Sequence, residues 1–272
     1  MKVVKIILIW VAAIVITLSA AIYQRMTGPT YPLRFKTEVN GEAYKFKLTR
    51  SASIGKGCTV EIPANENVAK AKIVYRKYPG NFKYDTLSMN KDTATWNVQL
   101  PVQPAAAKLE YFALLYNENG KLLFENSDNT AIVRFKGDVP AIVLTPHIIL
   151  MFLAMLFSTA AMLMAVFKFG NFRLTSFVTL GLLAVGGLIL GPIVQHYAFG
   201  EAWTGWPYGK DLTDNKTLIT AIFWIGAVVL NIKKPRRWAV IIAAVVLLAV
   251  YSIPHSARGS EFDHKSGEIV TG

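Results

Sequence analysis

Five apolar runs alternate with polar segments along this chain of 272 residues. They cover residues 4–23, 146–167, 174–197, 217–232 and 238–253. Each run approaches the ~20 residues that a helix needs to cross a hydrocarbon core of ~30 Å. A long region without such a run lies between the first two. The pattern therefore predicts a membrane protein with one inserted domain outside the bilayer.

Lysine and arginine occupy the short segments beside these runs. Lys2 and Lys5 precede the first run, Lys168 and Arg173 flank the link between the second and third, and residues 233–237 carry four more cations. Short cytoplasmic loops are enriched in these residues. The three segments alternate consistently, which predicts that they are cytoplasmic. The inserted domain, the link before the fourth run and the C-terminus then face the periplasm of a bacterial inner membrane.

The first run, within residues 1–25, has two interpretations. It is either a retained transmembrane anchor or a cleavable signal peptide, since an apolar stretch with the sequence LSAA follows two lysines. The apolar stretch continues to Tyr23 and its cleavage signal is weak, so the anchor is favoured. Both interpretations place the next domain outside the cytoplasm.

Residues 31–137 show the apolar–polar alternation of half-buried β-strands. Asn40-Gly41 and Asn119-Gly120 each separate two such stretches. Asn-Gly is the strongest short hairpin signal, because both turn positions need a positive φ. About eight short strands without a convincing helix predict a β-sandwich.

One stretch of this domain, residues 93–124, reads TATWNVQLPVQPAAAKLEYFALLYNENGKLLF. A strand with Trp96, a Leu-Pro stop, a Pro-rich link and Leu-Glu-Tyr resembles the later strands of immunoglobulin-like and fibronectin-like bacterial domains. The resemblance implies a domain that binds or spaces other molecules and suggests no catalysis. The region also contains no histidine, which removes the commonest general base.

The net charge of +12 does not indicate nucleic-acid binding, because part of the excess lies in the predicted cytoplasmic loops. Residues 24–137 hold 17 Lys and Arg against 10 Asp and Glu. This surplus suits either an ordinary solvated surface or contact with anionic headgroups or an acidic partner. The single cysteine, Cys58, excludes an internal disulfide and belongs to no metal-binding pattern.

All four histidines follow the inserted domain, and three of them are predicted at one level of the membrane. Thr145-Pro146 has the form of an N-cap and first helical residue, which places His147 in the outer turn of the second run. His196 closes the third run and His255 follows the fifth. Imidazoles at the edge of a bundle can ligate haem iron or a metal, or relay protons, whereas the alternative is an interfacial histidine bonded to loops or water. Met151 lies one turn below His147 and suits either a flat ligand or ordinary packing.

The link between the third and fourth runs, with the flanking residues 191–216, reads GPIVQHYAFGEAWTGWPYGKDLTDNK. Its aromatic residues, with Trp203 and Trp206 among them, suit the membrane interface. Thr213 or Asp214 can cap the next helix, while Asp211, Asp214 and Asn215 could alternatively hold a hard cation. Five residues of this link are predicted to form a loop over the bundle mouth: Glu201, Trp203, Trp206, Asp211 and Asp214. Ion pairs within that loop would use Glu201, Lys210 and Lys216.

Two family resemblances bear on this region. The link, together with the ending IPHSARGSEFDHKSGEIVTG, resembles an uncharacterised family of bacterial inner-membrane proteins. HIILMFLAM, which starts at His147, resembles proteins that join a DOMON-type sandwich to a cytochrome b561 helix bundle, in which histidines near helix ends ligate haem. That pattern has ligands at both membrane faces. No cytoplasmic-side histidine is found here, so the resemblance implies at most one haem site.

The expected fold class is a mixed membrane protein: an N-terminal anchor (1–25), an all-β immunoglobulin-like or fibronectin-like sandwich (31–137), a C-terminal four-helix transmembrane bundle (146–256) and a periplasmic tail (257–272). The expected function is electron transfer through b-type haem held by two of His147, His196 and His255, rather than enzymatic activity of its own. The alternative is a non-catalytic scaffold or accessory subunit whose sandwich binds an envelope protein. A small-solute transporter is less favoured, because the runs hold few charges. Membrane lipid is an expected partner, and nucleic acid and nucleotides are not.

Overall fold

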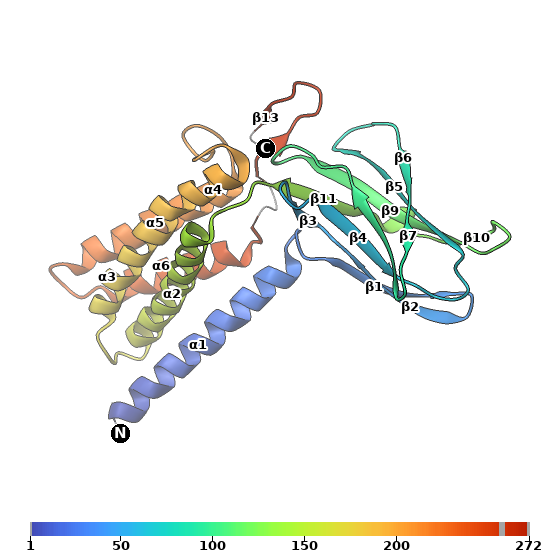
Figure 1. The fold of residues 1–272 in the computed structure, drawn as a ribbon. Helices are drawn as coiled ribbons and strands as arrows, with labels where there is room; N and C mark the ends of the chain where they lie inside the picture. Colours follow the sequence, from blue (N-terminus) through green and yellow to red (C-terminus); the bar gives the residue numbers. More distant parts are fainter. Residues whose placement is uncertain (1, 256–258, 271–272) are drawn as a thin grey trace. The chain divides into compact units, whose positions relative to one another are not determined.

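The computed structural model of the chain describes residues 2–255 and 259–270. It divides into two compact units (Figure 1). The helical unit comprises the described parts of residues 2–29 and 139–259, and the β unit comprises Thr30–Asp138 with Ser260–Val270. Residues 256–258 and 271–272, which were predicted to belong to the bundle end and the tail, lie outside the described residues.

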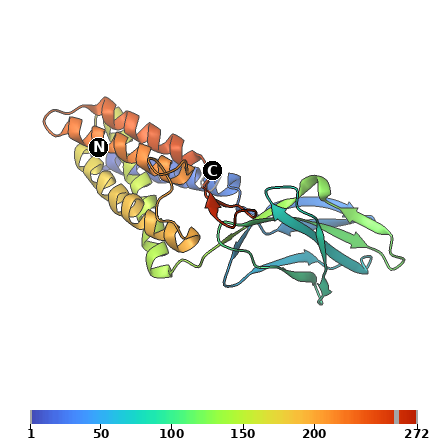
Figure 2. The same cartoon turned by 90° about the horizontal axis from the view of Figure 1, so that it is seen from above.

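The helical unit is built from long apolar helices, which run side by side in Figures 1 and 2. The elements are α1 (Lys2–Thr27), α2 (Ala141–Val166), α3 (Phe172–Leu183), the π-helix η2 (Ala184–Leu190), α4 (Gly191–Phe199), α5 (Leu212–Asn231) and α6 (Arg237–Ser252). Within the described residues, α1, α2, the continuous α3–η2–α4 helix and α5 are long and apolar enough to cross a membrane, and α6 is a shorter apolar helix of 16 residues. The chain therefore has the helices of a membrane protein.

Two predicted helix starts are wrong. Helix α2 begins at Ala141 rather than at Pro146, because the N–H groups of Val143 and Leu144 already reach the carbonyl of Pro140. Pro146 lies inside the helix, near enough to its start that only one early hydrogen bond is lost. Helix α5 begins at Leu212, before the predicted caps Thr213 and Asp214, because the carboxylate of Asp211 caps it there.

The β unit contains eleven strands between residues 30 and 138 and two more near the C-terminus. They are β1 (Leu33–Val39), β2 (Glu42–Leu48), β3 (Ser51–Ser53), β4 (Cys58–Pro63), β5 (Lys70–Tyr78), β6 (Asp85–Ser88), β7 (Asn90–Lys91), β8 (Thr95–Leu100), β9 (Lys108–Tyr116), β10 (Leu122–Glu125), β11 (Ala131–Lys136), β12 (Glu261–Phe262) and β13 (Ile269–Val270), with a 3₁₀ turn η1 (Ser127–Asn129). The central sheet has the order β3-β11-β9-β5-β6, with β10 also on β9. Separate sheets are formed by β4-β8-β7, by β1-β2 and by β12-β13.

One apolar core joins the three larger groups of strands. It includes Phe46 from β2, Trp96 from β8, and Tyr111 and Phe135 from the central sheet. Cys58 lies in this core at 2 % exposure, and burial raises the pKa of its thiol to about 11. Strands β2 and β4 bury alternate residues, as the sequence pattern predicts, whereas β9 buries five consecutive residues, Leu109 to Ala113.

Both predicted hairpins are confirmed. Strands β1 and β2 pair antiparallel across Asn40 and Gly41, whose φ values are 56° and 84°. Strands β9 and β10 pair across a turn in which Gly120 has a φ of 76°. Glycine adopts this left-handed region without the steric penalty of a side chain, which explains both choices.

The C-terminal segment Ser260–Val270, part of the predicted tail, is a component of the β unit. Arg134 donates to the carbonyl of Ser260, Lys108 pairs with Glu261, and the N–H of Phe262 reaches Ala106 at 3.4 Å. The rings of His264 and Phe262 make a T-shaped contact, with 5.4 Å between their centroids. The segment thus packs against the ends of β9 and β11, a long-range pairing that no local pattern indicates.

Candidate functional site

The carboxylates of Asp211 and Asp214 stabilise the first turn of α5 through different hydrogen bonds. Asp211 is the N-cap, and its Oδ1 accepts from the N–H groups of Thr213 at 2.7 Å and Asp214 at 3.3 Å. The predicted caps, Thr213 and Asp214, are therefore wrong. Asp211 is better placed because it precedes the first helical residue and has non-helical backbone angles.

Asp214 instead gathers the preceding loop around its buried carboxylate, which is 5 % exposed. Its Oδ2 accepts from the N–H of Thr204 at 2.6 Å, the N–H of Gly205 at 3.0 Å and Nε2 of Gln195 at 3.1 Å. The Thr204 hydroxyl accepts from the same Gln195 amide at 2.7 Å. One side chain at the start of α5 therefore fixes both the loop and the end of α4.

The loop approaches α5 closely enough to require glycine. A Cβ on Gly205 would lie 2.5 Å from Cβ of Asp214, well inside contact distance. Beside it, the N–H of Trp206 donates to Oδ1 of Asn215 at 2.7 Å, and Nε1 of Trp203 donates to the Trp206 carbonyl at 3.1 Å. Asp214 and Asn215 are thus occupied by backbone groups, the arrangement of a structural anchor.

His147 lies beside the π-helix η2. In η2 the N–H of Gly191 bonds to the carbonyl of Gly186, and Nδ1 of His147 bonds to the same carbonyl at 2.8 Å. A carbonyl only accepts, so Nδ1 carries the proton and Nε2 is the free ring nitrogen. π-Helical turns occur frequently at functional sites, which makes this contact a candidate for more than packing.

Lys216 is a buried charged group at this end of the helical unit, at 5 % exposure, as low as that of Asp214. Its Nζ donates to the carbonyls of Ile253 at 2.7 Å and Pro254 at 3.2 Å, just beyond α6. A cation is favoured at a helix C-terminus, where carbonyls lack partners. The ammonium of Lys216, predicted to pair with the acids of the loop, thus binds the carbonyls that follow α6.

A small cavity of about 10 Å³ lies between these elements. Its lining residues are Gln24, Thr213, Lys216, Thr217, Val250, Tyr251 and His255. This volume is about that of one water molecule. Nε2 of Gln24 is buried there without a protein partner, so a water that accepts from it fits the chemistry of the lining.

The predicted histidine site is assembled only in part. His255 is exposed and lies within electrostatic range of His147 and Lys216. His196 is exposed on α4, with its ring against Tyr197 at 6.2 Å. The sulfur of Met151 packs against η2 and lies 3.9 Å from the hydroxyl of Tyr251.

The predicted loop over the site has mixed outcomes. Trp203, Trp206 and Asp211 belong to the hydrogen-bonded loop described above, Asp214 lies in the first turn of α5 and binds that loop, and Glu201 is exposed. Among residues 2–255 and 259–270, no group of three His, Cys, Asp or Glu side chains could hold a metal ion. The acids of this loop serve the backbone.

The histidine donors here suit a haem, but the space around them is too small for one. Metal-ligating histidines commonly donate their second ring N–H to a carbonyl, as His147 does. However, Leu150 and Met151 fill the side of η2 that faces α2, and the cavity at His255 is about 10 Å³. Pockets for cofactors are commonly about 300 Å³ or more. No reaction step is therefore derived through haem.

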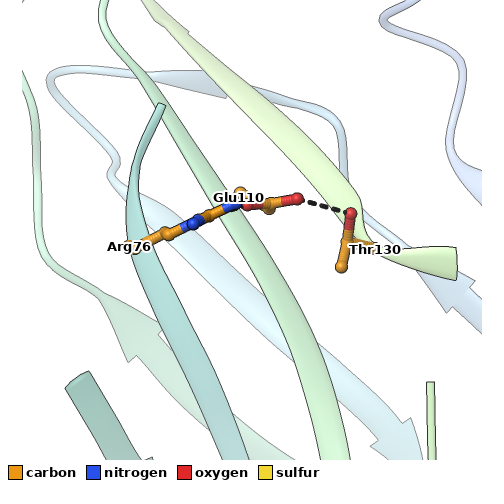
Figure 3. A network of polar contacts seen from close by, with 3 residues as sticks. All are labelled: Arg76, Glu110 and Thr130. Atoms are coloured by element: carbon orange, nitrogen blue, oxygen red, sulfur yellow. Dashed lines mark hydrogen bonds and ion pairs between the residues drawn. The ribbon is translucent and has the colours of Figure 1, made fainter. Parts of the chain in front are cut away.

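The β unit carries a second polar cluster, on the outward face of its central sheet. Figure 3 shows that Arg76 and Thr130 approach Glu110 from opposite sides. Nε of Arg76 donates to Oε2 of Glu110 at 2.5 Å, and the Thr130 hydroxyl donates to Oε1 at 2.9 Å. The guanidinium also lies 4.6 Å from the ring centre of Tyr84, which is 41 % exposed.

Sequence reasoning missed the roles of Gln195, Thr204 and Gly186 at the bundle end and of Arg76 and Glu110 on the sheet. A polar Gln195 near the end of an apolar helix was a usable signal, because it needs a partner. The Arg76–Glu110 pair depends on strand register, which one sequence does not reveal.

Comparison with known proteins yields no relationship: no family model, curated protein or solved structure matches the chain.

Proposed function

We propose that this chain is a membrane-anchored accessory protein of the bacterial envelope. The helical unit holds it in the inner membrane. The β unit, an immunoglobulin-like sandwich on the periplasmic side, binds a protein partner and catalyses no reaction of its own.

The observation that carries this proposal is the outward face of β5 and β9. Val74 lies opposite Phe112 and Arg76 opposite Glu110, so apolar and charged pairs stand side by side. Tyr84 covers them, with its ring edge-on to Phe112 at 5.8 Å. Tyrosine and arginine are enriched at the centres of binding interfaces, and a rigid sheet presents them with little loss of entropy.

The bundle end supports the same proposal. Asp214, Lys216 and Nδ1 of His147 are all engaged by backbone groups. Groups held in this way rigidify an anchor and are poorly placed to exchange protons with a substrate.

The test is co-purification of a stable neighbour after mild cross-linking of whole cells. Tyr84→Ala should reduce recovery of that neighbour at least about tenfold, in line with a hot-spot residue. Tyr208→Ala, which truncates a tyrosine 83 % exposed in the helical unit, is the matched control and should leave recovery unchanged. Equal recovery from both variants would contradict the proposal.

A second candidate, b-type haem electron transfer, rests on the His147–Gly186 hydrogen bond, which leaves Nε2 available. It predicts a Soret band in the purified protein that shifts on reduction with dithionite. His147→Ala and His255→Ala should abolish the band, whereas His264→Ala should retain it. A colourless preparation with full helical content excludes this candidate.

A further inference from the structure

The outer face of the β1–β2 hairpin carries four cations in two cross-strand pairs. Arg34 lies directly opposite Lys47, and Lys36 directly opposite Lys45. Residues two apart on a strand share a face, so all four side chains project from the same side. All four are exposed, while Phe35 and Phe46 stack on the inner face at 4.8 Å between ring centres.

This arrangement opposes the stability of the hairpin. Like charges directly opposite each other on antiparallel strands repel, because their Cβ atoms lie about 5 Å apart. The acids close by do not offset them. Glu42 is bonded by the amides of Asn65 and Asn67, which leaves Glu38 as the one carboxylate on the basic face. A face with a net surplus of three positive charges favours an anion in contact with it.

The covalent path of the chain indicates which anion. Helix α1 ends at Thr27 with Arg25 in its last turn, and β1 begins at Leu33. The five residues between them span at most about 20 Å when fully extended. The Arg34–Lys47 pair therefore stays within reach of the surface of the bilayer that α1 enters. Phosphate-bearing headgroups are the anions concentrated at that surface.

We propose that the outer face of the β1–β2 hairpin, formed by Arg34, Lys36, Lys45 and Lys47, binds anionic lipid headgroups of the membrane in which α1 is anchored. The contact is electrostatic and weakens as salt shortens the range of the interaction. The lipid contact orients the β unit on the bilayer. It adds a lipid requirement to the proposed partner binding, but the lipid contact itself does not depend on a partner.

The test uses the full-length protein in nanodiscs of neutral phosphatidylcholine, with or without phosphatidylglycerol. The acylation rate of each lysine with a neutral reagent is followed by mass spectrometry. Lys36, Lys45 and Lys47 should react at least about threefold more slowly in the anionic discs than in the neutral discs. Salt at ~0.5 M should restore their rates. Lys91 and Lys121, exposed lysines elsewhere in the β unit, are the internal controls and should keep their rates.

A matched pair of variants separates the hairpin from general charge. Lys36→Gln with Lys45→Gln should abolish the protection of Lys47, whereas Lys91→Gln with Lys121→Gln should leave it intact. Two outcomes overturn the proposal: equal rates in the two kinds of disc, or full protection in neutral discs by inorganic phosphate, which would assign the face to a free anion. Protection only when an acidic protein partner is added would also overturn it.

Discussion

Oδ2 of Asp214 accepts a hydrogen bond of 2.6 Å from the backbone N–H of Thr204, ten residues earlier in the chain. The same oxygen also accepts from Gly205 and Gln195. A carboxylate in the first turn of α5 therefore determines the path of the loop before it. Negative charge is favoured at a helix N-terminus, so the position suits the group as well as the loop.

Replacing this carboxylate tests its organising role. Asp214→Asn should lower the free energy of unfolding by about 2 kcal/mol, because a neutral amide oxygen accepts more weakly than a carboxylate from the donors of Thr204, Gly205 and Gln195. The melting temperature should fall, and the fluorescence of Trp203 and Trp206 should report the displaced loop. Glu201→Gln, a change at an exposed acid of the same loop, is the control and should have little effect. Similar melting temperatures for the two variants would show that the network has no stabilising role.

The close approach of the loop predicts a steric effect at Gly205. A Cβ there would lie 2.5 Å from Cβ of Asp214, so Gly205→Ala must displace the loop or the helix. We expect destabilisation of about 1–3 kcal/mol, as for other overpacked sites. Gly226→Ala in the middle of α5 meets nothing within 4 Å and should be neutral or slightly stabilising. Thermal unfolding of both variants in the same detergent makes the comparison.

Cys58 provides a probe of the β core. Burial raises the pKa of its thiol to about 11, so almost no thiolate is present at pH 8 and the sulfur is also inaccessible. The folded protein should react with a maleimide only when it unfolds. The variant Cys58→Ala with Thr59→Cys moves the thiol to the exposed neighbour on β4 and should react in the native state. Rapid native labelling of Cys58 would contradict the packing described for the core.

His264 makes the docking of the C-terminal segment sensitive to pH. Burial lowers its pKa below the usual 6.5. The charge of Lys77 adds to this shift, although a hydrogen bond to the Lys108 backbone and the charge of Asp263 oppose it. The docked state therefore favours neutral imidazole. Its contribution is fully present above pH 6.5 and is lost as the pH falls below that value.

Hydrogen exchange of residues 260–270, corrected for intrinsic rates, checks this prediction. Protection should be higher at pH 7.5 than at pH 5.5. In His264→Phe the ring remains but cannot be protonated, so protection should no longer change with pH. A pH dependence that persists in the variant would assign the effect to another group.

Features set by neighbouring residues were predictable from the sequence, and those set by distant contacts were not. Asn40-Gly41 predicts its hairpin because the positive φ is a local requirement, and the apolar runs predict the helices because their length is a property of each segment. The cap of α5 was misassigned because Asp211, Thr213 and Asp214 are all capable caps, and only the loop fold distinguishes them. The Arg76–Glu110 pair depends on a register set by packing between strands 34 residues apart.

The most direct test of the accessory-protein proposal is site-specific photo-cross-linking in living cells. A photoreactive phenylalanine analogue at position 84 should yield one discrete adduct with another envelope protein, and Glu110→Arg should suppress that adduct by breaking the adjoining pair. The same analogue at position 208 is the control and should yield none. Absence of any adduct from position 84 in correctly folded, membrane-inserted protein would contradict the proposal.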